Sequence, residues 1–140
     1  MPKKKITSFG FSQKAFIYNK AGKFLTIRRT KTAPFGPLKW DLPGGDVEFG
    51  EDLLKSIKRE IKEETGLIVK NLKLFTADGH ITDNGQHWIT LAYTGEIAAD
   101  KLNISWKHDL YKWVNLNQFL KLALPRKLKL FAKDLKNIKI

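Results

Sequence analysis

Three glutamates, Glu60, Glu63 and Glu64, are the residues of this chain whose type and spacing best suit catalysis. On an α-helix they fall within an arc of roughly 100°, so their carboxylates line one edge. Glu60 and Glu64 are like charges one turn apart, which costs about 0.2 to 0.5 kcal/mol even on an exposed helix. A hard divalent cation would offset that repulsion, because Mg²⁺ binds one or two carboxylates together with water and phosphate oxygens. The acidic stripe therefore predicts a magnesium site that binds phosphates.

A glycine pair precedes the stripe, in the segment Pro43-Gly44-Gly45. Without a Cβ, these residues let the backbone approach a ligand closely and offer a carbonyl to a metal or an N–H to a phosphate. Each feature alone has an ordinary alternative. A helix with mixed charges is usually a solvated face, and Pro-Gly-Gly is usually a plain turn. Their joint spacing is what favours a site.

From Gly45 the chain reads GDVEFGEDLLKSIKREIKEETGL, which resembles the Nudix box. The box runs glycine, five residues, glutamate, seven residues, and then Arg-Glu-aliphatic-any-Glu-Glu-any-Gly-aliphatic. Its specified positions are filled by Gly45, Glu51, Arg59, Glu60, Ile61, Glu63, Glu64, Gly66 and Leu67. By residue abundance, such a match anywhere in the chain has a chance on the order of one in ten million. The segments 40–44 and 111–116 also resemble family flanks, so the resemblance covers most of the chain.

The resemblance implies an α/β fold, a Nudix-type α/β/α sandwich with a mixed β-sheet and a catalytic loop-helix-loop. It assigns the metal ligands to Glu60, Glu63, Glu64 and a backbone carbonyl at Gly44 or Gly45. Arg59 matches the arginine that orients a box glutamate, and Glu51 matches a structural position. Glu63 and Glu64 are expected to be pure ligands, while Glu60 also helps to orient the attacking water.

The activity implied by the resemblance is hydrolysis of a phosphoanhydride bond in a nucleoside-diphosphate-containing substrate, with Mg²⁺ as the cofactor and Mn²⁺ as a substitute. Many family members use a further acid outside the box as general base. Asp109, just before the strand predicted at 110–114, is the favoured candidate here, and Glu96 is the second. The alternative for Asp109 is an ordinary exposed loop residue.

The elements that must position these residues follow from periodicity and turn signals. Strands are predicted over residues 9–18, 24–28, 67–76, 87–97 and 110–114, with hairpins at 19–23 and at Asn84-Gly85. Residues 30–39 and the glycine pair are expected in loops. A helix is predicted over residues 51–65, with Leu53, Leu54, Ile57 and Ile61 on its core side and Gly66 as its stop. A last, basic helix opens at Pro125 and is expected to pack on the sheet.

Composition limits the class of protein. We expect one domain over residues 1–140, because the length suits one core and the 42% apolar and 29% charged fractions are globular values. No apolar stretch is long enough to span a bilayer, and no secretory signal is visible, so a cytoplasmic location is expected. The absence of cysteine excludes thiolate chemistry and leaves oxygen-bound hard cations favoured. The three histidines have no ligand-like spacing and are expected to be surface or hydrogen-bonding residues.

Substrate choice rests on residues outside the box. Trp40 and Trp88 can stack a base and Arg28 and Arg29 can meet phosphates, although each aromatic has the alternative of belonging to the core. Family markers for ADP-ribose and dinucleoside polyphosphates, a proline or a tyrosine soon after the box, are missing. By elimination the favoured substrate is a nucleoside triphosphate, cleaved to nucleoside monophosphate and pyrophosphate.

The net charge of +12 keeps nucleic acid among the possible partners. Basic residues gather at both ends, over residues 3–5 and 121–139. Two alternatives therefore stay open beside the nucleotide enzyme. One is an enzyme acting on the 5′ end of RNA, and the other is a non-catalytic nucleic-acid-binding module on the same fold. The number of chains, one or two in a homodimer, is open as well.

Overall fold

The structure is a computed structural model that describes residue 5 and residues 7–138. Of the basic ends noted in the sequence, Lys3, Lys4 and Lys139 lie outside the described residues. So do residues 1, 2 and 6 of the N-terminal segment that was considered as a secretory signal. No helix among the described residues is long and apolar enough to cross a membrane.

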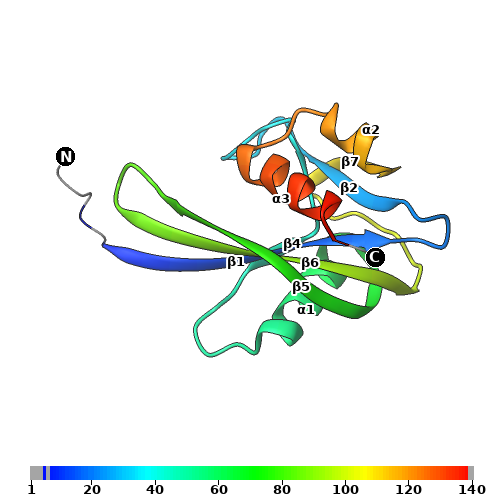
Figure 1. Ribbon diagram of the computed structural model, residues 1–140, viewed down its shortest axis with the longest axis horizontal. Coiled ribbons are helices and arrows are strands. Elements are labelled where there is room, and N and C mark those ends of the chain that lie inside the picture. Colours follow the sequence, from blue (N-terminus) through cyan, green and yellow to red (C-terminus); the bar gives the residue numbers. More distant parts are fainter. Residues whose placement is uncertain (1–4, 6, 139–140) are drawn as a thin grey trace.

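Among the described residues, strands dominate and three helices accompany them (Figure 1). The strands are β1 (Ser8–Tyr18), β2 (Phe24–Arg29), β3 (Trp40–Asp41), β4 (Gly44–Asp46), β5 (Ile68–Ile81), β6 (Gln86–Ala99) and β7 (His108–Val114). The helices are α1 (Leu53–Thr65), α2 (Leu116–Leu120) and α3 (Arg126–Lys136).

The strands form one mixed sheet in the order β3-β2-β1-β6-β5, with β4 paired to β1 and β7 paired to β2. Strands β1 and β6 run parallel, and the other pairs are antiparallel. Helix α1 covers one side of this sheet, and α3 lies on the other side (Figure 1). The α/β sandwich with a mixed sheet, predicted from the sequence, is confirmed.

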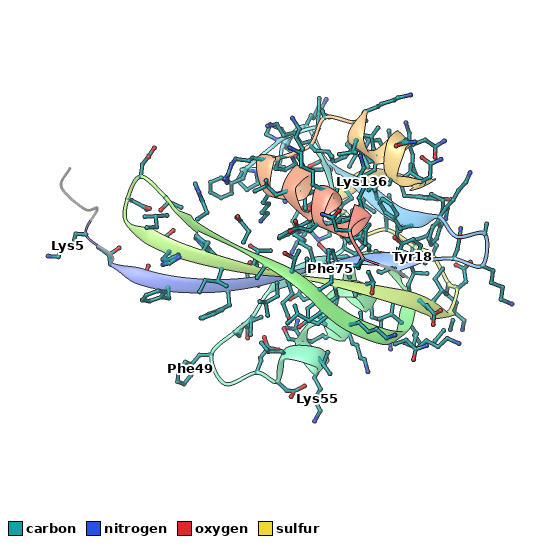
Figure 2. The ribbon with its side chains drawn as sticks, viewed as in Figure 1. Lys5, Tyr18, Phe49, Lys55, Phe75 and Lys136 are labelled. Carbon is teal, nitrogen blue, oxygen red and sulfur yellow. The ribbon has the colours of Figure 1, made fainter. Side chains whose placement is uncertain are left out.

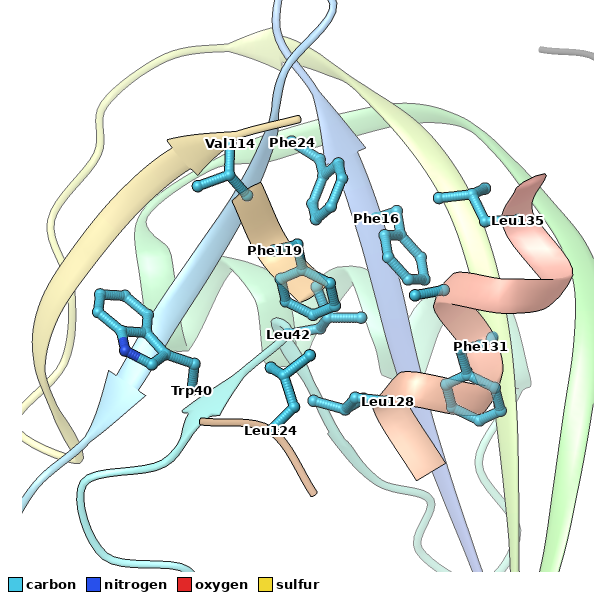
Figure 3. Packing of buried hydrophobic residues seen from close by; sticks show 12 residues of the cluster. Phe16, Phe24, Trp40, Leu42, Val114, Phe119, Leu124, Leu128, Phe131 and Leu135 are labelled. Carbon is cyan, nitrogen blue, oxygen red and sulfur yellow. The ribbon is translucent and has the colours of Figure 1, made fainter. Parts of the chain in front are cut away.

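Alternate residues of β1 supply the two hydrophobic cores, as expected for a strand buried on both faces. Phe16 belongs to the core beneath α2 and α3, where it packs against Phe24 and Phe119 at ring-centroid distances of 4.9 and 5.9 Å (Figure 3). Its neighbours Ala15 and Ile17 belong to the second core, beneath α1. Hydrophobic cores therefore pack against both faces of β1, the strand that pairs with the glycine strand β4.

Several predicted elements are confirmed with different bounds. Both hairpins form, and Gly85 takes a φ of 85° at the second turn. Strand β5 reaches Ile81 rather than ending near residue 76, because β6 provides a partner along the polar segment as far as the pair Ile81↔His87. The glycine pair is not in a loop but in β4. Helix α3 packs on the sheet as predicted, with Leu128, Phe131 and Leu135 in the core.

Two sequence expectations about α1 and the histidines are wrong. Leu53 and Leu54 do not reach the core and stay 43% and 46% exposed, because periodicity gives the direction of a side chain but not where the covering sheet ends. His108 is not a surface residue: it is buried, and its Nδ1 has no hydrogen-bond partner.

Candidate active site

Helix α1 is fixed at both ends, and this determines where its acidic edge lies. The Asp52 side chain accepts a hydrogen bond from the Lys55 N–H at 3.0 Å, and Gly66 ends the helix in the left-handed conformation with a φ of 75°. Gln13 of β1 donates from Nε2 to the Leu53 carbonyl at 2.9 Å, and the Tyr93 hydroxyl donates to Gln13 Oε1 at 2.7 Å. These contacts, which the sequence did not reveal, tie the start of α1 to the sheet.

Strand β4 brings the glycine pair against both β1 and α1. Lys14 pairs with Gly44 and Gln13 pairs with Gly45. A Cβ on Gly44 would lie 1.9 Å from the Gln13 carbonyl oxygen, and a Cβ on Gly45 would lie 2.5 Å from Cδ and Oε2 of Glu60. Both positions therefore require glycine, the first for strand pairing and the second for the approach of a glutamate.

Two of the predicted site glutamates meet this strand. The Gly44 N–H donates to Glu64 Oε1 at 2.9 Å, and the Glu60 carboxylate lies directly over Gly45. Burial raises the pKa of Glu64 to about 7, with smaller opposing effects from Lys14 and from the hydrogen bond of Gly44. The structure thus brings Glu60, Glu64, Gly44 and Gly45 together.

Behind Glu64 lies an ion pair that the sequence did not reveal. Lys14 Nζ donates to Asp41 Oδ2 at 3.0 Å and to the Leu42 carbonyl at 3.3 Å, and both charged side chains are almost fully buried. Burial by itself would lower the pKa of Lys14, but the attraction of Asp41 and Glu64 outweighs it and the pKa is raised. The available signal in the sequence was a lysine in the middle of a predicted strand, but its partner Asp41 lies 27 residues away along the chain.

Arg59 organises the opposite, more exposed side of the acidic edge. Its guanidinium donates to both Glu51 oxygens at 3.1 and 2.9 Å, to Glu60 Oε1 at 3.1 Å and to both Glu63 oxygens at 3.4 Å. The hydrogen bonds to Glu51 are the main reason that the pKa of Arg59 is raised. Glu63 is consequently turned toward Arg59 and is 59% exposed, away from the contacts that bring Glu60 and Glu64 to the glycines.

The carboxylates present suit a hard cation. Among the described residues, no group of three or more histidine, aspartate or glutamate side chains is already arranged as a metal cluster. Mg²⁺ needs only one or two carboxylates, however, when water and substrate phosphates complete its shell. Glu60 and Glu64 supply two oxygen-donor side chains, and Gly45 leaves the space for Glu60 that a Cβ would fill. These residues fit a divalent cation.

The other predicted site residues lie in different surroundings. Arg28 donates from Nε and Nη2 to the two Asp109 oxygens, each at 2.9 Å, and these bonds are the main cause of the lowered pKa of Asp109. Arg29 Nη1 lies 3.6 Å from Asp41 Oδ2, so it joins the buried pair. The second base candidate, Glu96, accepts a hydrogen bond from Asn71.

The two tryptophans proposed as base-stacking residues differ in exposure. Trp40 is 6% exposed, belongs to the core under α3, and has Lys112 Nζ 5.0 Å from its ring centroid. Trp88 is only partly buried, and its ring lies over Gly10, where a Cβ would be 2.6 Å from the ring atoms. Because Gly10 and Lys14 are both even-numbered positions of β1, Trp88 shares the sheet face of Lys14.

A mixed sheet between helices, with a glutamate-bearing helix set against a glycine strand, defines a class of phosphoanhydride hydrolases. Residues 10–135 match the family model described as NUDIX domain. Because this match spans most of the chain, the protein belongs to the Nudix family, and it is a hydrolase that acts on a pyrophosphate bond.

Solved and curated relatives agree with this assignment. The structure is similar to the MutT protein of Methanosarcina mazei Go1, with a TM-score of 0.79 and 30% identity over 99% of this chain and 100% of that one. The ADP-ribose pyrophosphatase of Methanocaldococcus jannaschii is 35% identical, covering 76% of this chain and 63% of the relative. The RNA pyrophosphohydrolase of Bartonella clarridgeiae is 26% identical, covering 88% and 86%.

Proposed function

We propose that this chain hydrolyses a nucleoside triphosphate to nucleoside monophosphate and pyrophosphate, with Mg²⁺ as its cofactor. The observation that carries the proposal is that Glu64 and Glu60 contact Gly44 and Gly45 of β4, close to the buried ammonium group of Lys14. One water is consumed and one bridging P–O bond breaks, so the two products share the three phosphates.

The chain's own residues hold the reacting groups. Mg²⁺, when bound, would neutralise diphosphate oxygens and polarise the phosphorus toward attack by water. Glu64 is fixed by the Gly44 N–H, while Arg59 binds Oε1 of Glu60 and leaves Oε2 over Gly45, where it is suited to orient a water. Glu63 completes the predicted ligand set if its side chain turns from Arg59 toward the cation.

Recognition of the nucleotide is assigned to the sheet face opposite α1. Trp88 offers an aromatic surface there, and Ser12 and Thr90 share a hydrogen bond of 2.7 Å between their hydroxyls. Lys14 and Arg29 add positive charge close to the glutamates, which favours binding of a polyphosphate. Trp40, by contrast, fits a structural role in the core.

The test is a substrate panel assayed with Mg²⁺, with Mn²⁺ and with chelator. The panel contains nucleoside triphosphates, ADP-ribose, dinucleoside polyphosphates and RNA with a 5′ triphosphate. We expect metal-dependent release of pyrophosphate from free nucleoside triphosphates, reduced about 100-fold or more in the Glu64→Gln variant. Preferred cleavage of ADP-ribose, or equal rates with and without chelator, would overturn the proposal.

A second candidate is hydrolysis at the 5′ end of RNA. It is favoured by relatives named RNA pyrophosphohydrolase, such as those of Sphingopyxis alaskensis and Acidiphilium cryptum, each 26% identical over most of this chain. The net charge of +12 is suited to a polyanionic substrate. A kcat/KM for 5′-triphosphate RNA at least ten times that for free nucleotide would select this candidate, whereas salt-sensitive RNA retention without turnover would point to binding alone.

A further inference from the structure

One part of the sheet extends beyond the helices. The start of β1, the end of β5 and the start of β6 project past α1 and α3 as a three-stranded arm (Figure 1). On this arm Phe9 pairs with His87, Phe11 pairs with Ile89, and His87 also pairs with Ile81. Paired residues on neighbouring strands share a face, so these side chains lie on one side of the arm.

That side is the one that faces α1. Side chains alternate along β1, so Phe9 and Phe11 point the same way as Gln13, which is bonded to the Leu53 carbonyl of α1. Further along the strand this face is covered by α1. Around Phe9 and Phe11, which remain 64% and 43% exposed, the helix no longer reaches it.

The loop between β4 and α1 extends the same apolar area. Its Val47 N–H donates to the Phe11 carbonyl at 2.8 Å, which attaches the loop to the strand. Two residues later Phe49 stands fully exposed at the bend of the loop, on the α1 side of the sheet (Figure 2). Leu53 follows in the first turn of α1. The outer apolar surface is defined here as Phe9, Phe11, Phe49, Leu53 and Ile81.

The size of this surface matches one half of a protein interface. Given the area that an aromatic or aliphatic side chain presents, the outer apolar surface exposes roughly 500 Å². A standard interface takes about 800 Å² from each partner, a little over half of it apolar, so about 450 Å² of apolar area is required. The surface therefore supplies the apolar part of one such half.

Charge indicates which partner fits. The described residues of the arm that share this face carry no Lys, Arg, Asp or Glu side chain: Phe9, Phe11, Gln13, Ala77, Gly79, Ile81, His87, Ile89 and Leu91. Nucleic acid is held by cations, which this face does not offer. A partner of like charge can approach it, because these positions of the arm carry no positive charge. Beside Phe49 and Leu53, the loop part of the surface carries the exposed acids Glu48 and Asp52. A second copy of this chain presents a matching apolar face, with the arm free of charged side chains on this side.

We propose that the outer apolar surface is the interface of a homodimer, in which two copies pack this surface against each other around a two-fold axis. Phe9, Phe11 and Phe49 are the central contacts. The interface lies on the sheet face opposite to the one that carries Trp88 and Lys14, so dimer formation leaves the proposed nucleotide face open.

The test measures mass by sedimentation equilibrium between about 1 and 100 µM on nuclease-treated protein. The wild-type chain is expected at twice 16.1 kDa, and the double variant Phe9→Ser/Phe49→Ser should dimerise at least about 100-fold more weakly. Both side chains are exposed, so the fold should survive, which circular dichroism checks.

Phe35→Ser is the matched control, because Phe35 is 80% exposed but lies outside the surface, and it should dimerise like wild type. Raising the salt to 0.5 M should strengthen the wild-type dimer, since it screens repulsion between basic chains. A wild-type monomer at 100 µM, or equal dimer affinity in the double variant and the wild type, would overturn the proposal.

Discussion

The two sides of the acidic edge of α1 carry the same residue type in opposite surroundings. On the exposed side, Glu51 and Glu63 share the guanidinium of Arg59. On the buried side, Glu64 has the Gly44 N–H and, behind it, the Lys14–Asp41 pair. These two adjacent glutamates therefore differ in their surroundings. Glu63 belongs to the exposed ion pairs of Arg59, whereas Glu64 is a buried carboxylate with a pKa of about 7. Position relative to β4, and not glutamate spacing alone, separates them.

The largest effect is expected when the two adjacent glutamates are compared directly. Glu64→Gln should lower kcat about 100-fold or more without unfolding the protein, because it removes a fixed carboxylate from the proposed cation site. Glu63→Gln should have a smaller effect and lower kcat about 10-fold. The reason is that the Glu63 oxygens contact Arg59 and not the glycine strand. The measurement is steady-state kinetics at saturating Mg²⁺, with Mg²⁺ titrated to separate weaker metal binding from slower chemistry.

Glu48→Gln, in the exposed loop before α1, is the control and should retain wild-type turnover. If Glu63→Gln lost as much activity as Glu64→Gln, the distinction between the two sides would not hold in the working enzyme. Near-normal activity in both variants would remove the site assignment altogether.

The next comparison separates folding from positioning within β4. Gly44→Ala should lower the free energy of unfolding by about 3 kcal/mol, because its Cβ meets the backbone oxygen of Gln13 at 1.9 Å and neither can move without breaking strand pairing. Gly45→Ala meets only the flexible end of Glu60, so stability should change by less than about 1 kcal/mol. Its kcat should still fall about 10-fold, because Glu60 is displaced. Urea unfolding and kinetics on both variants check this, and equal stability losses would contradict it.

Much of this arrangement was visible in the sequence, and the limits have physical causes. Ile57 and Ile61 predicted the buried side of α1, and the Nudix box predicted that glutamates and glycines would meet. The Lys14–Asp41 pair was not predicted, because a contact between distant strands leaves no periodic signal. Arg59 and Glu63 stand one helical turn apart, a spacing that favours their ion pair, and the structure has it. Local patterns could not show that the same guanidinium also binds Glu51 and Glu60, since several carboxylates lie within its reach.

The last expected effect concerns pH and His108, which lies among the charges behind Glu64. Burial lowers the pKa of His108 to about 4, against an opposing attraction from Asp41 and with help from the cations Lys14, Arg29 and Lys107. A histidine whose pKa is lowered in the folded state is protonated more readily when unfolded, so its contribution to stability is complete above pH 6.5 and is lost as the pH falls toward 4. At pH 5 this loss is about 2 kcal/mol.

The test compares the free energy of unfolding, measured in urea at pH 7.5 and at pH 5. Between these two pH values it should drop by about 2 kcal/mol less in His108→Gln than in wild type. His80→Gln, at an exposed position, should keep the wild-type drop. The same drop in all three proteins would mean that His108 is solvated and that the buried side of the edge is open to water, in which case burial could not set Glu64 apart from Glu63.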